Sequence, residues 1–338
     1  WTGTPGLIGS CAGRGWSPGW RIREVRVSGR PVDDFIVAGP AVVEYALEAV
    51  SASLWMLLVV EMLPTGLVRV RATLENVGDA PFEVTELTLR MPVPGQARDL
   101  MDFGGRWAAE RMPQRTRLDM GVRRREGRHG RTGADAAFVL SLGEEGFGYQ
   151  TGEIWACHVA WSGNHLHLAE RDFTGAQLIG GGELLLPGEG WLTAGRRYRS
   201  PWVYFNHAVG LDAQAERFHQ HLRALPLHPD SERPVSLNVW EAVYFDHDVS
   251  RLIDLAEQAA ALGVERYVLD DGWFGARRDD HAGLGDWVVS PEVWPEGLHP
   301  LVNRGTELGM QFGLWFEPEM VNPDSDVARA HPEWLMQL

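Results

Sequence analysis

The first two-thirds of the chain alternate apolar and polar side chains with a period of two residues. The runs at 21–27 (RIREVRV), 68–74 (VRVRATL) and 82–89 (FEVTELTL) show this alternation, and turns rich in glycine, asparagine or proline separate them. Short runs with this period are typical of antiparallel strands that bury one face of a sheet. The pattern therefore predicts an antiparallel β-sandwich up to about residue 205.

The pattern changes at about residue 210. A helix is predicted over 213–222, with its end near Leu225 and Pro226, and a proline-rich linker follows it up to Pro234. Beyond the linker, strands are predicted at 235–240, 264–269 and 310–316, and helices at 249–262 and 297–308. Strands that alternate with helices form parallel sheets with right-handed crossovers. We expect a multi-domain β and α/β protein, with the sandwich and its connecting helix at 1–230 and a doubly wound sheet or truncated barrel at 231–338.

Composition and charge exclude several classes of function. Hydrophobic residues make up 44% and charged residues 23% of the 338 residues, which is a globular rather than a disordered composition. The net charge of −15 argues against nucleic acid as a partner, because nucleic-acid-binding proteins present a basic face. All 31 basic residues are arginines. Without lysine, the chain can form neither a Walker phosphate-binding loop nor a Schiff base.

Cysteine usage and hydrophobicity bear on cellular location. The two cysteines, Cys11 and Cys157, cannot form a disulfide framework or a four-thiolate metal site. The longest apolar run, 54–62, contains a glutamate and is too short to span a bilayer. We therefore expect a cytoplasmic protein with no membrane contact. Because the chain begins with Trp1 and stops at Leu338 after a helix-like segment, we also expect it to be a fragment.

Acidic residues and tryptophans gather where the predicted parallel strands end. These strand-end residues are Trp240 and Glu241, then Asp270 and Asp271, then Trp315, Glu317 and Glu319. The carboxyl ends of barrel strands build active sites, and two adjacent carboxylates are costly to place in a core. Each acid alone would more often be a turn or a helix N-cap. Three such strand ends together favour a binding or catalytic site.

The residue types at these strand ends suit a carbohydrate. Carboxylates accept hydrogen bonds from sugar hydroxyls, and indole faces cover the apolar face of a pyranose ring. The chain has 15 tryptophans, although a tryptophan often packs in a core or an interface instead. The histidines at 129, 158, 165 and 167 lack a carboxylate partner at the spacing of a metal site. The loop Asp279–Asp280–His281 could mimic a metal site but is more typical of a solvated turn. We expect no metal and no cofactor.

Ordered motifs strengthen the carbohydrate interpretation. Those of the α/β part are NVWEA at 238–242, LDDGWFG at 269–275, LGDW at 284–287, FGLWFEPEMV at 312–321 and HPEW at 331–334. Looser ones in the first domain are GRW at 105–107 with Glu110 and Arg111, and WSGN at 161–164. This series resembles glycoside hydrolase family 36, the α-galactosidases of the melibiase type.

The resemblance implies a fold and an activity. The fold is an N-terminal antiparallel β-supersandwich followed by a (β/α)8 TIM barrel, of which this chain would hold the first part. The activity is retaining hydrolysis of terminal α-galactosides, such as melibiose and raffinose, through two aspartates. By motif, Asp270 and Asp271 would hold the galactose O4 and O6 hydroxyls, and Trp240 and Trp315 would wall the same subsite. The nucleophile and the acid/base are expected beyond Leu338, so no catalytic residue is assigned and the chain alone is expected to be inactive.

Some alternatives stay open. A raffinose-synthase-like α-galactosyl transferase would be built on the same barrel, and a non-catalytic carbohydrate-binding protein would hold sugar with the β-domain alone. Many members of the family carry an aspartate, which reaches a neighbouring subunit's site, where this sequence has Trp16. Substrate range and the completion of the site by a neighbouring subunit therefore both stay open at this position. The resemblance also implies a homo-oligomer, either a dimer or a tetramer.

Overall fold

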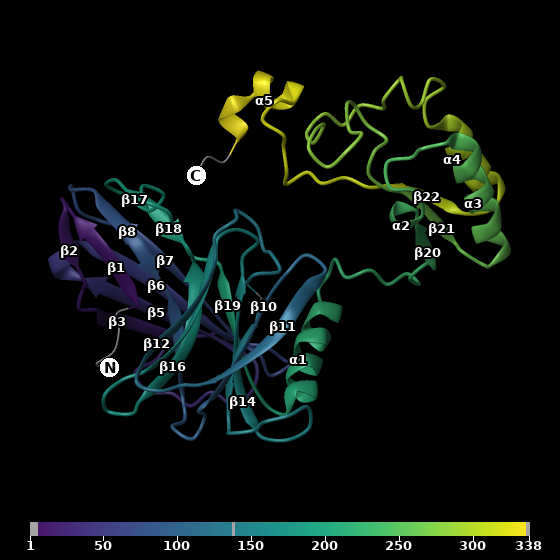
Figure 1. Cartoon of the computed structure of the whole chain (residues 1–338). Coiled ribbons are helices and arrows are strands. Elements are labelled where there is room, and N and C mark those ends of the chain that lie inside the picture. Colours follow the sequence, from purple (N-terminus) through teal and green to yellow (C-terminus); the bar gives the residue numbers. More distant parts are fainter. Residues whose placement is uncertain (1–5, 137–138, 336–338) are drawn as a thin grey trace. The chain divides into compact units, whose positions relative to one another are not determined.

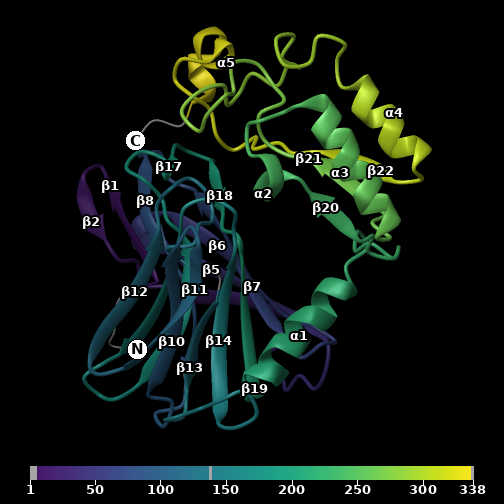
Figure 2. The same ribbon diagram turned by 45° about the vertical axis from the view of Figure 1, so that its right-hand side comes forward.

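The computed structural model describes residues 6–136 and 139–335. The chain divides into two compact units, Trp1–His228 and Pro229–Leu338 (Figures 1 and 2). The first unit is built almost entirely of strands, and the second alternates strands with helices. This confirms the predicted order of a β-sandwich followed by an α/β segment.

The described part of the first unit forms three antiparallel sheets. The largest has the order β11-β10-β13-β14-β19-β7-β6-β5-β3-β4, with β18 also paired to β7, and two smaller sheets have the orders β17-β8-β1-β2 and β12-β15-β16-β9. Their strands are β1 Leu7–Cys11, β2 Arg14–Trp16, β3 Arg21–Val27, β4 Arg30–Pro31, β5 Ala41–Ala49, β6 Leu54–Met62, β7 Val68–Asn76, β8 Phe82–Leu87, β9 Leu89–Val93, β10 Asp99–Arg106, β11 Ala109–Arg117, β12 Gly121–Gly127, β13 Val139–Gly143, β14 Glu153–Ala160, β15 His165–Arg171, β16 Gln177–Glu183, β17 Trp191–Leu192, β18 Arg197–Arg199 and β19 Trp202–Val209. A short 3₁₀ helix, η1 (Val50–Ala52), joins β5 to β6.

The sheets of the first unit pack face to face because their strands bury alternate side chains. In β7, the burial pattern follows the period of two, and Val70, Ala72 and Leu74 point into the core. Strand β16 of a small sheet packs against β14 and β19 of the largest sheet. The residues between the sheets form one apolar cluster that includes Phe82. The predicted sandwich is therefore explained by strand periodicity.

Helix α1 (Leu211–Arg223) closes this unit against β19 and β14. It confirms the helix predicted over 213–222. The chain enters it through Gly210, whose φ of +82° favours glycine, and a Cβ at this position would lie 2.3 Å from the carbonyl oxygen of Tyr149. The close approach fixes where the helix begins.

The second unit contains three parallel strands in the order β20-β21-β22. The strands are β20 (Ser236–Asn238), β21 (Arg266–Leu269) and β22 (Gln311–Leu314), and the helices are α2 (Trp240–Val243), α3 (Val249–Ala261), α4 (His299–Glu307), α5 (Asp326–Ala330) and the 3₁₀ helix η2 (Pro332–Trp334). Helix α3 is capped by Asp248, whose side chain accepts a hydrogen bond from the Arg251 amide at 2.9 Å. Parallel order and both long helices agree with the prediction.

The first strand is shorter than the sequence indicated. It was predicted over 235–240 but ends at Asn238. The side-chain oxygen of Asn238 accepts a hydrogen bond from the Trp240 amide at 2.8 Å, and this bond turns the chain into α2. Trp240 therefore starts a helix instead of ending a strand.

The core of the second unit lies between the sheet and its helices. Leu252 of α3, Tyr267 and Leu269 of β21 and Leu301 of α4 are fully buried together. The hydroxyl of Tyr267 donates to the carbonyl of Leu252 at 2.9 Å, so the one polar atom of this buried ring is satisfied. Helices α3 and α4 contact each other, and α4 contacts β22. None of the helices in the described residues is apolar enough over a sufficient length to span a bilayer.

Candidate functional site

The sequence-predicted site residues meet at the carboxyl edge of the parallel sheet. In the strand register, Asn238 lies beside Val268, and Leu269 lies beside Leu314. One further backbone hydrogen bond extends the pairing of β21 with β22: the Trp315 amide donates to the Leu269 carbonyl at 3.0 Å. Asp270 and Asp271 therefore follow the middle strand, with the Trp240 backbone on one side and Trp315 on the other.

Asp270 is almost fully buried and is held by its neighbours. One carboxylate oxygen accepts the Asp271 amide at 2.7 Å, and the other accepts the side-chain amide of Asn238. Because the Asn238 oxygen also accepts the Trp240 amide, this one side chain ties the ends of β20 and β21 together. Asn238 stands in a recognised motif, but its role depends on a contact across 32 positions that the sequence does not reveal.

Asp271 is paired with Arg277, and both side chains are buried. The Arg277 Nε atom lies 3.0 Å from each carboxylate oxygen, and Nη2 lies 2.7 Å from Oδ2. The guanidinium also donates to the Ala282 carbonyl at 3.0 Å and lies 5.5 Å from the centre of the Phe245 ring. A forked, two-oxygen contact of this kind fixes the orientation of a carboxylate. Sequence analysis missed Arg277, although it follows the LDDGWFG motif closely.

These contacts determine how many acceptor positions remain on each carboxylate. A carboxylate offers about four lone-pair positions for hydrogen bonds. Asp270 uses two of them and Asp271 uses three in the bonds described above. Asp270 therefore has more capacity left to accept hydroxyl donors than Asp271. The sequence alone could not rank the two adjacent residues.

Aromatic rings surround the strand ends, and they differ in burial. Trp273 and Phe274 are buried in the core, whereas Trp240 and Trp315 are partly exposed. Two neighbouring tryptophans hold Trp315 in place. Trp273 Nε1 donates a hydrogen bond to the Trp315 carbonyl at 3.0 Å, and the ring centres of Trp287 and Trp315 lie 6.1 Å apart. The motif tryptophans thus divide into core residues and two faces accessible to a ligand.

Trp240 is held by two aromatic neighbours. Its ring lies 4.9 Å from Tyr244 and 5.1 Å from Phe245, in edge-to-face arrangements. Tyr244 has a φ of +48°, which is strained for a residue with a side chain, and its hydroxyl donates to Glu241 at 3.0 Å. The strained turn after α2 therefore orients the Trp240 face.

Other acids in the motifs have structural roles. Asp286 accepts the amides of Asp326 at 2.9 Å and Val327 at 3.1 Å, so it caps α5 from a distant part of the chain. Asp279 accepts the His281 amide at 2.9 Å in an exposed turn. Within the described ranges, no group of three or more histidine, cysteine, aspartate or glutamate side chains could hold a metal ion.

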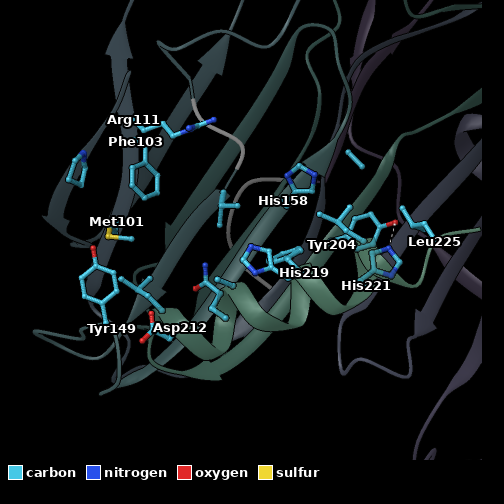
Figure 3. Close-up of a pocket in the computed structure, with 18 residues that line it drawn as sticks. Met101, Phe103, Arg111, Tyr149, His158, Tyr204, Asp212, His219, His221 and Leu225 are labelled. Carbon is cyan, nitrogen blue, oxygen red and sulfur yellow. Dashed lines mark hydrogen bonds between the residues drawn. The ribbon is translucent and has the colours of Figure 1, made fainter. Parts of the chain in front are cut away.

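A cavity lies elsewhere, in the first unit. It has a volume of about 780 Å³ and lies between helix α1 and strands β10, β11, β13, β14 and β19 (Figure 3). Its labelled lining is mainly aromatic and aliphatic, with the hydroxyl of Tyr204 3.4 Å from His221 Nε2. Burial, and next the charge of Arg69, lower the pKa of His221. Among the described residues that line the cavity, Asp212 is the only carboxylate, so these residues offer no acid pair comparable to the strand ends.

Two family models together match most of the sequence. The model described as glycosyl hydrolase family 36 N-terminal domain matches residues 1–192, and the Melibiase model matches residues 197–338. The chain belongs to glycosyl hydrolase family 36. The backbone of Trp16 ends strand β2, and the side chain of this residue lies outside the described part of the structure.

Relatives named as α-galactosidases agree with this assignment. An α-galactosidase of Escherichia coli is 41% identical over 280 residues, which are 82% of this chain and 40% of that protein. Alpha-galactosidase AgaA of Geobacillus stearothermophilus is 35% identical over 272 residues, or 79% of this chain and 37% of that one. The chain thus spans less than half the length of these relatives.

Solved structures of family 36 enzymes share the fold. A variant of AgaA from Geobacillus stearothermophilus in complex with raffinose superimposes with a TM-score of 0.88 and 29% identity, covering 99% of this chain and 49% of that one. The galactosidase domain of the α-galactosidase–sucrose kinase AgaSK gives a TM-score of 0.84 with 29% identity, covering 97% and 47%. Both units of the chain are therefore parts of a fold known from this family.

Proposed function

We propose that the whole protein is an α-galactosidase that hydrolyses terminal, non-reducing α-D-galactosyl residues of melibiose- or raffinose-type sugars with retention. The observation that supports this most is the pair Asp270–Asp271 at the end of the middle strand, with the partly exposed residues Trp240 and Trp315 following the two flanking strands. Relatives named α-galactosidases and a relative solved with raffinose support the same substrate class. The three parallel strands at 231–338 are proposed to begin a (β/α)8 catalytic barrel.

In this proposal, Asp270 and Asp271 bind the sugar and do not react with it. Their carboxylates accept hydrogen bonds from the galactose O4 and O6 hydroxyls, and Trp240 and Trp315 cover the ring. Retaining hydrolysis needs two carboxyl groups about 5–5.5 Å apart, one of which carries a proton to the leaving group. Asp271 is tied to a buried arginine and Asp270 to two amide donors, which suits fixed acceptors rather than a proton carrier. The nucleophile and the acid/base are therefore assigned to other parts of the whole protein.

An assay of the whole protein beside the 338-residue chain tests this function. We expect the whole protein to release galactose from an aryl α-galactoside and from melibiose, and the chain alone to release none. Proton NMR of the first product should show the α-anomer of galactose. Transfer of galactose to sucrose without release of free galactose would instead assign the protein to the α-galactosyl transferases. Turnover by the chain alone that is lost in Asp270→Ala would place a reacting carboxylate at these strand ends.

We also propose that the whole protein is a homo-oligomer, a dimer or a tetramer, in the cytoplasm. The β-unit exposes several large aromatic side chains, among them Trp107, Phe173 and Trp191, which suit a contact between copies. Both cysteines are free, and Cys157 is buried, as suits a reducing compartment. Sedimentation at micromolar concentration should show a species of at least twice the monomer mass. A monomer throughout would contradict this proposal.

A further inference from the structure

A buried histidine packs directly behind the turn that carries Asp271. His247 lies between α2 and α3 and is 7% exposed. The next residue of the turn, Gly272, has a φ of +103°, and a Cβ there would lie 3.3 Å from both Cε1 and Nε2 of the His247 ring. Phe245 would lie equally close, at 3.2 Å. The imidazole therefore fills the space beside Gly272 and limits where this turn can move.

The shape of the ring carries this contact. Among the described residues, neither buried nitrogen of His247 has a hydrogen bond of good geometry, although the backbone of Asp271 and of Tyr244 acts on the ring from close by. The Trp294 ring lies 5.7 Å away at an angle of 70°, so an aromatic surface covers another side of the imidazole. On the turn itself, Arg278 donates to the Gly272 carbonyl at 2.9 Å. The Asp271–Gly272 turn is thus held by an arginine and by an imidazole ring that acts as a spacer.

The charges around His247 disfavour its protonated form. Arg278 and Asp271 are the charged groups that act on the ring, and Asp271 is already neutralised by Arg277. The neighbouring acids in sequence are exposed and engaged elsewhere, with Asp246 on Arg251 and Asp248 at the cap of α3. Burial is the largest cause that lowers the pKa of His247, and the charge of Arg278 adds to it. The backbone of Asp271, the carboxylate of Asp271 and the backbone of Tyr244 act in the opposite direction without cancelling the shift.

We propose that His247 is a positioning residue, whose neutral ring wedges the Asp271–Gly272 turn in place and whose protonation in mild acid releases this turn. The part of the proposal that concerns galactoside binding rests on the proposed function. A protonated imidazole in this site would have to leave the buried space beside Gly272 or remain there, out of water and near the charge of Arg278. Either event moves the Asp271 carboxylate relative to Asp270, so acid should weaken sugar binding more than it slows the reaction step.

The direction of the pH effect follows from linkage. A histidine whose pKa is lowered on folding binds fewer protons in the folded state than in the unfolded state. The stability that its neutral form provides is fully present above the unfolded pKa of about 6.5. It is lost as the pH falls from there towards the lowered folded pKa. The relevant window is therefore below about pH 6.5.

Three variants of the whole protein separate shape from titration. His247→Phe keeps a flat ring without nitrogens, His247→Ala removes the wedge, and His281→Phe alters an exposed histidine of the same unit as a control. At pH 7.5, KM for an aryl α-galactoside should stay within about 2-fold of wild type in His247→Phe and in His281→Phe. In His247→Ala, KM should rise about 10-fold, and kcat should change less than KM. Between pH 7.5 and 5.5, KM should rise about 5-fold in wild type and His281→Phe but not in His247→Phe.

Two outcomes would overturn the inference while leaving the proposed function intact. One is an acid rise of KM in His247→Phe equal to that of wild type, and the other is a wild-type KM in His247→Ala. Melting temperatures give a readout that needs no hydrolysis, since the decrease from pH 7.5 to 5.5 should be smaller in His247→Phe than in wild type. If wild type hydrolyses no α-galactoside, the proposed function fails, and equal decreases in melting temperature would then reject the wedge as well.

Discussion

The Asp270→Asn variant of the whole protein is expected to lose about 2–4 kcal/mol of transition-state stabilisation in kcat/KM for an aryl α-galactoside. The carboxylate accepts two amide donors within the protein and keeps two further acceptor positions. An asparagine has one acceptor oxygen, so it cannot serve both internal donors and also accept from sugar hydroxyls. The loss should therefore appear in both KM and kcat.

A matched control removes the same charge outside the site. Asp280 lies in the loop that follows β21, is exposed, and pairs with the exposed His281. Asp280→Asn should keep kcat/KM within about 2-fold of wild type. Urea unfolding of both variants must show folded protein under assay conditions. If Asp270→Asn is folded and keeps wild-type kcat/KM, Asp270 does not bind the reacting sugar.

The Arg277→Met variant is expected to have the largest effect on stability, a loss of about 3–5 kcal/mol in the free energy of unfolding of the α/β unit. The substitution leaves the buried carboxylate of Asp271 without its forked partner. Adding Asp271→Leu removes the stranded charge, so the double variant should recover most of the stability. Its kcat/KM should stay low, because Asp271 is no longer available to the sugar.

The exposed Arg304 provides the comparison. It pairs with Glu257 at 2.8 Å and Glu307 at 3.1 Å, yet its side chain is solvent-accessible. Arg304→Met should therefore cost no more than about 1 kcal/mol in urea unfolding. Equal losses in Arg277→Met and Arg304→Met would mean that the Asp271–Arg277 pair is not the buried element described above.

Much of the fold follows from the pattern of side chains. Alternation in runs such as 68–74 predicts strands that bury one face, and the structure has β7 there with Val70, Ala72 and Leu74 inside. The sheet order is not contained in that pattern. β14 pairs with β19, and β19 pairs with β7, although long stretches of sequence separate these strands. Such pairings depend on how the apolar faces of whole sheets pack against each other, which the pattern within one strand does not show.

The candidate site was predictable in position but not in its internal contacts. Parallel strands bring Asp270, Asp271 and Trp315 to one edge, as their order along the chain indicates. Arg277 and Asn238 carry no periodic signal, and their importance comes from the carboxylates that they hold. His247 is equally hidden, since one histidine between two helices gives no sign that it packs on Gly272.

Discrimination between galactosides and glucosides tests the account most directly, because these sugars differ in the direction of the O4 hydroxyl. The measurement is kcat/KM for aryl α-galactoside divided by kcat/KM for aryl α-glucoside, in the wild-type whole protein and in Asp270→Asn. We expect the wild type to prefer the galactoside by at least about 100-fold, and the ratio to fall by about 10-fold or more in the variant, if a charge-assisted bond to O4 is lost. A wild-type ratio near one, or a ratio that Asp270→Asn leaves unchanged, would contradict the assignment of these strand ends as the galactose site.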